Sequence, residues 1–177
     1  MNKLLEEMYT FQNEIALRDN ASAASVATLA SVGKDYFTSV AGGLLSLGEI
    51  HAPLSQTCKL LKRCSEENYE NEIKTHLVNN YKIPGWGSSF IKEKPDPVFF
   101  AVDCMLEGTK TKETERRITK YLHKEGLNLY PNASYYTIAC CIESKIPTEE
   151  ASFHLVAARL PAWTHLWKAT NKNNSLR

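Results

Sequence analysis

Apolar residues recur at helical spacing along most of the chain and predict a protein built of α-helices. Near the N-terminus, Leu4, Met8, Phe11 and Ile15 stand three or four residues apart, which is the period of a helix with one apolar face. Such a face has to pack against other elements of the protein. We therefore expect an N-terminal helical arm over residues 1–19 and an all-α fold.

Two helices of small residues follow this arm. The first covers residues 21–31, is rich in alanine and begins after Asn20, a residue type that caps helices well. The second covers residues 37–47 and contains Gly42 and Gly43; each glycine costs about 1 kcal/mol relative to alanine in a helix. We therefore expect another helix or a ligand to approach these glycines closely. The spacing also predicts that the second helix buries one stripe, made of Phe37, Val40, Ala41, Leu44, Leu45 and Leu47.

The rest of the chain alternates further helices with irregular segments. Glycines and prolines between positions 83 and 97 exclude regular structure there, and the polar residues 109–115 predict another loop. We expect the large residues of a helix over 98–106 to be buried, and the basic side of a helix over 112–124 to be solvated. The remaining helices are expected over residues 54–64 and 73–81, and from Pro147 onward.

Composition narrows the class of protein. The 177 residues suffice for one ordinary domain with its own core, and an apolar fraction of 43% is that of a soluble globular protein. A net charge of +1 argues against nucleic-acid and membrane-surface binding. Five cysteines without a CxxC pair predict neither a disulfide framework nor a metal site. We therefore expect a cytoplasmic protein, in which Cys140 and Cys141 pack inside a helix or, alternatively, serve a redox role.

The run NASAASVATLASVGKDYFTSVAGGLLSLGEIHAP, which begins at Asn20, resembles the central segment of the citrate synthase family. That family has NAST, an alanine-rich helix and a second helix ending in GPLHGGA, where this chain has GEIHAPL. The resemblance implies that the second helix places His51 at its end. It also implies that His51 is the histidine that polarises the thioester carbonyl of acetyl-CoA and stabilises its enol. Without the resemblance, His51 is read as a structural histidine.

A second motif lies in the irregular loop. The family has PGxGH followed by DPR; this chain has PGWG, then Ser88 in place of the histidine, and Val98 in place of the arginine that grips a substrate carboxylate. In the family, the backbone of this loop embraces the adenine of coenzyme A. A glycine turn with an aromatic plug is the alternative interpretation. The resemblance implies a cofactor-binding role for Pro84, Gly85, Trp86 and Gly87.

Two more motifs follow in the family's order. PNASYY matches the family's PNVDF, with Ser134 in place of the aspartate that abstracts the methyl proton of acetyl-CoA, and Asn132 at a position that lies against the nucleotide. FHLVAARLPAWTHLW matches a motif that implies a carboxylate-binding Arg159 and a packing anchor at Trp163. A serine hydroxyl cannot replace a carboxylate base without its own activating partner.

The resemblance implies a citrate synthase-like helical fold with dimer-forming helices and a remnant of the small coenzyme-binding domain. We expect these parts within one compact domain of residues 1–177. They are the arm 1–19, the helices of 20–54 leading to His51, the remnant small domain 55–130 with the PGWG loop, the C-terminal helices 131–168 and a tail 169–177.

The family needs three catalytic groups, and this chain keeps one of them, His51. Losing a general acid or base costs about 10² to 10⁴ in rate. The resemblance therefore predicts a catalytically degenerate protein, virus-encoded or otherwise rapidly diverged, that acts in assembly or binding. We expect a homodimer or higher homo-oligomer and a protein partner, without nucleic acid or membrane. No cofactor is required, and coenzyme A is a weak ligand.

Two alternatives remain open from the sequence. One is an active acyl-CoA enzyme of the citrate synthase or citryl-CoA lyase type, which uses His51 with Ser88 or Ser134 in place of the usual acids. The other sets the resemblance aside and leaves a helical interaction module. Its contact surface would be the PGWG loop with Trp163 and Trp167.

Overall fold

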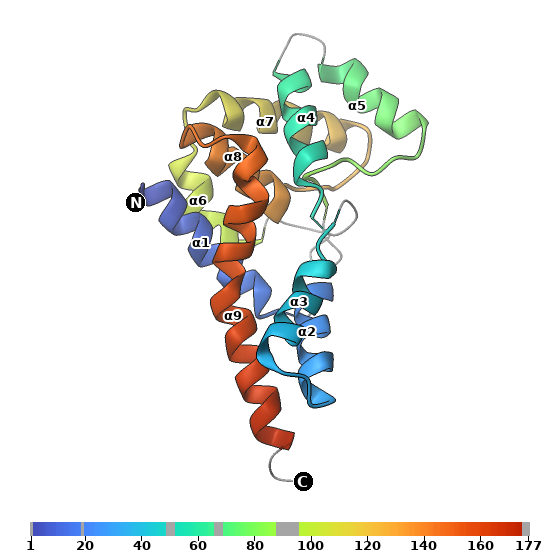
Figure 1. The fold of residues 1–177 in the computed structure, drawn as a ribbon. Coiled ribbons are helices and arrows are strands. Elements are labelled where there is room, and N and C mark those ends of the chain that lie inside the picture. Colours follow the sequence, from blue (N-terminus) through green and yellow to red (C-terminus); the bar gives the residue numbers. More distant parts are fainter. Residues whose placement is uncertain (1, 19, 49–51, 66–68, 88–95, 175–177) are drawn as a thin grey trace. The chain divides into compact units, whose positions relative to one another are not determined.

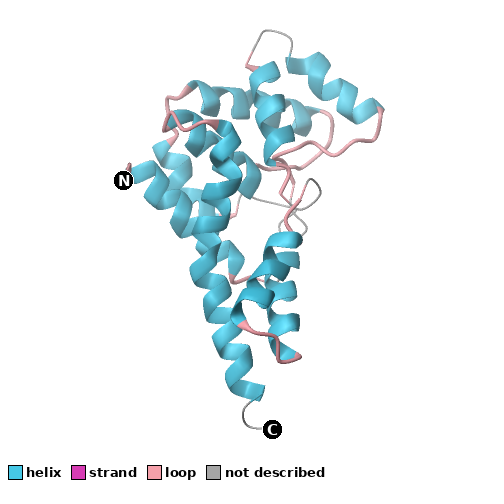
Figure 2. Cartoon of the chain, in the orientation of Figure 1, coloured by secondary structure: helices cyan, strands magenta, loops and turns pink. Residues whose placement is uncertain are grey.

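The computed structural model describes residues 2–18, 20–48, 52–65, 69–87 and 96–174, and its regular elements there are all helical (Figures 1 and 2). In these ranges nine α-helices and two short 3₁₀ helices follow one another. The β-type pairing in the same ranges is one isolated antiparallel bridge, between Trp86 and Pro131. The predicted all-α fold is therefore confirmed.

The chain divides into two compact units. The first unit contains Met1–Met8 and Pro53–Ala151, and the second contains Tyr9–Ala52 and Ser152–Arg177. The expected division treats residues 1–177 as one domain and ends the remnant small domain at residue 130. Within the first unit, the helix after Pro131 packs on the helix that begins at Leu54.

The second unit is built from α2 (Ala21–Ser31), α3 (Tyr36–Leu45) and most of α1 (Lys3–Ala16) and α9 (Ala151–Asn174). Asn20 caps α2 as predicted, because its side chain accepts hydrogen bonds from the backbone amides of Ser22 and Ala23. The helices α2 and α3 pack on each other. Residues 169–174 of the expected tail are helical, since α9 continues to Asn174.

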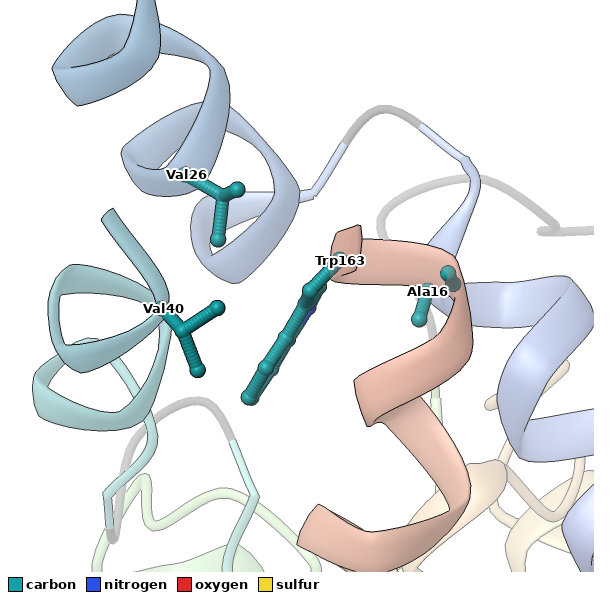
Figure 3. Packing of buried hydrophobic residues seen from close by; sticks show 5 residues of the cluster. Ala16, Val26, Val40 and Trp163 are labelled. Atoms are coloured by element: carbon teal, nitrogen blue, oxygen red, sulfur yellow. The ribbon is translucent and has the colours of Figure 1, made fainter. Parts of the chain in front are cut away.

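Trp163 is the centre of this unit's core. Its side chain is fully buried and lies against Val26 of α2 and Val40 of α3, with Ala16 of α1 on the other side (Figure 3). A buried aromatic ring of this size contributes a large share of the apolar area of a small unit. The role of Trp163 as a packing anchor is therefore confirmed.

The glycines of α3 admit this close packing. A Cβ atom at Gly43 would lie 2.8 Å from Cγ2 of Val26 and 3.3 Å from Cε2 of Trp163, and one at Gly42 would overlap the side chain of Leu29. The predicted close approach of a second helix is confirmed.

The predicted buried stripe of α3 is right for Val40 and wrong for most of its other members. Phe37 is 80% exposed and Leu45 is 87% exposed, whereas Ser39, Val40 and Gly43 are buried. The helix turns its small residues inward because only they let α2 come this close, and its large apolar residues consequently face outward. In addition α3 ends at Leu45, so it does not run as far as His51.

The first unit holds the other helices: α4 (Leu54–Cys64), α5 (Tyr69–Val78), α6 (Phe100–Met105), α7 (Lys110–Lys124) and α8 (Ala133–Glu143). Its 3₁₀ helices are Pro97–Phe99 and Thr148–Glu150. The helix α8 is its most buried element, and the predicted packing role of Cys140 and Cys141 is confirmed, since both thiols are fully buried.

Three local expectations for this unit are wrong. Residues 109–115 are not a loop, because the Thr109 side chain accepts a hydrogen bond from the amide of Lys112 and so starts α7 early. The basic side of α7 is not wholly solvated, since Lys112 is 7% exposed and paired with acids. Phe100 and Met105 are 73% and 45% exposed, because a helix of six residues turns only part of its surface to the core.

Candidate functional site

The loop of residues 84–87 takes a backbone form that needs glycine at two positions. Gly85 has φ of 88° and Gly87 has φ of 83°, in the left-handed region that residues with a Cβ rarely adopt. A Cβ atom at Gly85 would also lie 2.8 Å from Cγ2 of Thr57. Pro84, Gly85 and Trp86 are buried. The two glycines therefore permit the backbone form of this loop.

Residues 130–132 hold the loop in place from a distant part of the chain. The amide of Gly87 donates to the carbonyl of Tyr130 at 2.8 Å, and the amide of Asn132 donates to the carbonyl of Gly85 at 2.9 Å. The Asn132 side chain adds a hydrogen bond from Nδ2 to the carbonyl of Gly87 at 2.8 Å. The structure therefore brings together the PGWG loop and Asn132, which lie 45 residues apart.

Asn132 also starts the helix that carries Ser134. Its Oδ1 accepts from the amide of Ser134 at 2.9 Å, which makes Asn132 the cap of α8. Ser134 lies in the first turn of α8 and is 6% exposed. One asparagine thus fixes both the loop and the position where the family motif has aspartate.

Trp86 anchors the other side of the loop. Its indole Nε1 donates to Oγ1 of Thr119 at 3.0 Å, and its ring lies 5.4 Å from the ring of Tyr135. Oγ1 of Thr119 in turn donates to Glu115 at 2.7 Å. The aromatic plug is therefore tied by hydrogen bonds to charged groups of α7.

Glu115 belongs to a charged triad with Lys112 of α7 and Asp103 of α6, in which Lys112 and Glu115 are buried and Asp103 is partly exposed. Nζ of Lys112 lies 2.7 Å from Oδ1 of Asp103 and 2.7 Å from Oε2 of Glu115. Tyr136 donates to the same oxygen of Asp103 at 2.8 Å. Burial lowers the pKa of Lys112, but the hydrogen bonds and charges of the two carboxylates outweigh it, so the pKa is raised and the ammonium is retained.

A pocket of about 430 Å³ opens beside this triad within the first unit. It lies among α6, α7, α8 and the segment that precedes α8. Its lining combines charged groups with rings: Asp103, Lys112, Glu115, Arg116, Thr119, Lys120, His123, Tyr130, Pro131 and Tyr136.

Arg159 forms a separate polar centre inside the second unit. It is 4% exposed, and its Nε donates to Oε1 of Gln12 at 2.9 Å while one terminal nitrogen lies 3.4 Å from Oγ of Ser22. Both partners are neutral, and burial lowers the pKa of the guanidinium to about 10. No carboxylate pairs with it among the residues that the structure describes. A buried cation without an acid is costly.

The family model for the C-terminal domain of citrate synthase matches residues 4–177. This chain belongs to the citrate synthase family. A comparison with curated proteins found no match.

Solved structures of known proteins share the fold of this chain. Citrate synthase from Thermotoga maritima MSB8 is 25% identical with a TM-score of 0.80, over 93% of this chain and 48% of that one. Citryl-CoA lyase from Hydrogenobacter thermophilus is 18% identical with a TM-score of 0.78, over 96% and 68%. ATP citrate lyase from Methanosaeta concilii, in complex with (3S)-citryl-CoA, is 15% identical with a TM-score of 0.81, over 98% and 32%. The chain therefore spans about half the length of the Thermotoga citrate synthase.

Within this citrate synthase-family chain, the predicted site residues divide into three groups. Pro84, Gly85, Trp86 and Gly87 lie together with Asn132, and Ser134 follows on α8. Arg159 lies in the second unit. His51 and Ser88 lie outside the described residues.

Several residues that support these positions were not predicted from the sequence. Thr119 accepts a hydrogen bond from Trp86, 33 residues away in the sequence. Gln12 accepts one from Arg159, 147 residues away. Neither has a motif of its own. The ion pair of Lys112 with Glu115 could have been predicted from the sequence, because residues three apart on a helix share a face.

The described part of this citrate synthase-family chain contains neither a cluster of metal ligands nor a membrane-spanning helix. No group of three or more His, Cys, Asp or Glu side chains there could hold a metal ion. None of the helices described is both long and apolar enough to cross a membrane.

Proposed function

We propose that this chain is a catalytically degenerate member of the citrate synthase family that acts through binding and assembly. The observation that carries the proposal is Ser134, a buried hydroxyl in the first turn of α8 where the family motif has its aspartate. A hydroxyl abstracts a methyl proton only with an activating partner. Ser88 adds a second loss, since the family motif has a histidine there.

The PGWG loop of residues 84–87 supports a remaining affinity for coenzyme A. Its contacts to a base would come from the backbone of residues 84–87, and this backbone is held by Asn132 and Trp86 rather than by catalytic side chains. The Methanosaeta relative is a complex with (3S)-citryl-CoA. We propose coenzyme A as a weak ligand, with a dissociation constant of about 1 mM, or about 4 kcal/mol of binding free energy.

Calorimetry with coenzyme A at high concentration tests this binding. We expect saturable heat from the natural chain and none from Gly85→Ala, because the new Cβ atom would meet Thr57 at a residue with positive φ. The matched control is Gly108→Ala, since Gly108 also has positive φ but has no atom within 4 Å of its Cβ position. Absence of heat from the natural chain leaves the fold as a scaffold alone.

A thiol-release assay tests the catalytic half of the proposal. With acetyl-CoA and oxaloacetate we expect no rate above background. Normal turnover contradicts the proposal and leaves an active acyl-CoA enzyme. The observation that favours that second candidate is Arg159, whose buried guanidinium is ready for a substrate carboxylate.

We also propose self-association through α3. Its outward face carries Phe37, Leu44 and Leu45, which are 80%, 39% and 87% exposed, next to the exposed Ala41. Exposed apolar groups gathered on one helix are typical of protein interaction sites. A second copy of the chain is the occupant that the family resemblance favours, through a two-fold contact.

A further inference from the structure

Thr119 uses its hydroxyl in an unusual way for a threonine inside a helix. Such a hydroxyl commonly donates to the backbone carbonyl one turn earlier. In the described helices this bond is made by Thr57, Thr75, Thr114, Thr137 and Thr164. Oγ1 of Thr119 instead donates to Oε1 of Glu115 at 2.7 Å and accepts the indole N–H of Trp86 at 3.0 Å. Thr119 therefore links two other side chains.

The chemistry of the groups fixes the direction of these two hydrogen bonds. An indole N–H can only donate, so Oγ1 of Thr119 must accept from Trp86. The hydroxyl has a single proton, which is left for the carboxylate of Glu115. Oε2 of that carboxylate lies 2.7 Å from Nζ of Lys112. The charged triad thus orients Glu115, Glu115 orients the hydroxyl of Thr119, and that hydroxyl orients the indole of Trp86.

Burial makes this link between the loop and α7 difficult to replace. Glu115 is 4% exposed and Trp86 is 5% exposed, so water is not readily available as a substitute partner for either group. A buried donor or acceptor that loses its partner is destabilised unless it finds another one. Removal of Oγ1 from Thr119 would leave both groups in that position, and the indole would shift toward a new acceptor.

A shift of the indole would act on the whole PGWG loop, because Trp86 lies between the two glycines of the loop. The carbonyl of Gly85 accepts from the amide of Asn132, and the carbonyl of Gly87 accepts from the side chain of Asn132. These bonds hold the backbone of the loop, whereas Thr119 is the hydrogen-bond partner of its one aromatic side chain. The loop thus has two separate supports.

We propose that Thr119 is a positioning residue for the PGWG loop. Its hydroxyl holds the indole of Trp86 and thereby keeps the backbone of residues 84–87 in the form that would receive a base. This inference rests on the function proposed above, since coenzyme A is the ligand proposed for the loop. Thr119 acts on that ligand through Trp86. The position therefore requires a hydroxyl, which serine supplies and valine does not.

NMR spectra of the full chain without a ligand test this role. Thr119→Val keeps the shape of the side chain and removes its hydroxyl. We expect it to shift the indole resonance of Trp86 and the amide resonance of Gly87, and to speed hydrogen exchange of that amide about three- to tenfold. Thr119→Ser should restore the natural pattern. The matched control is Thr114→Val, the same change on the same helix, where the hydroxyl bonds to a carbonyl of that helix.

A double-mutant cycle and a ligand titration extend the test. Trp86→Phe keeps a ring and removes the N–H, so Thr119→Val should change the Gly87 amide less in that background than in the natural chain. In a titration with coenzyme A, Thr119→Val should weaken binding about three- to tenfold, the equivalent of one hydrogen bond. Thr119→Ser and Thr114→Val should bind as the natural chain does.

Three results would overturn the proposal. They are unshifted resonances of Trp86 and Gly87 in Thr119→Val, the same shifts in Thr119→Ser or in Thr114→Val, and an affinity for coenzyme A that Thr119→Val leaves unchanged. If the natural chain binds no coenzyme A, only the proposed function fails. The resonances of Trp86 and Gly87 are measured without a ligand and still decide whether Thr119 positions the loop.

Discussion

Gly43 shows how strongly one residue constrains the second unit. The Cβ atom of any other residue would lie within 3.4 Å of both Val26 and Trp163. Overpacking of this kind costs about 1–3 kcal/mol, so we expect Gly43→Val to lower the free energy of unfolding by that amount. Gly48→Val is the control, because no atom lies within 4 Å of its Cβ position. Denaturant unfolding measures both, and equal stabilities of the two variants would contradict the packing described here.

The buried thiols make stability depend on pH. Burial raises the pKa of Cys64 to about 12 and that of Cys141 to about 11, and it raises the pKa of Cys140 as well. The unfolded thiols ionise near pH 8.5 while the folded ones keep their protons, so stability is complete below about pH 8.5 and falls as pH rises toward the folded values. Each thiol should contribute a loss of about 1 kcal/mol by about pH 9.5.

Unfolding by urea at pH 7.5 and pH 9.5 checks this expectation. Cys141→Ala should reduce the dependence on pH, whereas Cys104→Ala should leave it unchanged because Cys104 is exposed. The same free energy of unfolding at both pH values would count against it.

Among the elements, α8 depends on a single asparagine for two tasks. Asn132→Ser keeps a capping oxygen for the amide of Ser134 but cannot reach the carbonyl of Gly87, and we expect it to cost about 1 kcal/mol. Asn132→Ala loses both contacts and should cost about 2 kcal/mol. Thermal unfolding separates the two variants. If serine and alanine cost the same, the capping contact contributes nothing to stability.

The elements also show where sequence reasoning succeeds. Periodicity and capping residues predicted α1 and α2, because a helix with an apolar stripe or a strong cap carries its signal locally. The buried face of α3 was predicted correctly only at Val40, because hydrophobic size was taken as the guide, whereas the proximity of α2 selects small residues. The start of α7 was missed because the polar residues 109–115 were taken as a loop, whereas Thr109 caps the helix through the amide of Lys112.

The sequence predicted the motif residues of the candidate site but not the residues that support them. The PGWG loop and Asn132 were named from motifs, and the structure brings them together. Thr119 and Gln12 were not named, because each acts through one hydrogen bond to a residue far away in the sequence. The motifs therefore name the loop and Asn132, and only the structure identifies the residues that hold them in place.

For the whole molecule, we expect a homodimer that depends on the outward face of α3. Phe37→Glu with Leu45→Glu places two charges on this exposed apolar surface and should shift the chain to a monomer in sedimentation, since an unpaired charge buried in an interface is costly. Val78→Glu is the control, because Val78 is 71% exposed on a different helix. A monomer already in the natural chain would contradict this prediction.

We expect that this citrate synthase-family chain does not abstract the methyl protons of acetyl-CoA. The most direct test is the exchange of the methyl protons of acetyl-CoA for deuterium, followed by NMR in D₂O, because this step needs no acceptor acid. We predict no exchange above the rate without protein, since Ser134 offers a hydroxyl where a base is needed. Exchange that the natural chain accelerates and Ser134→Ala abolishes would contradict the claim.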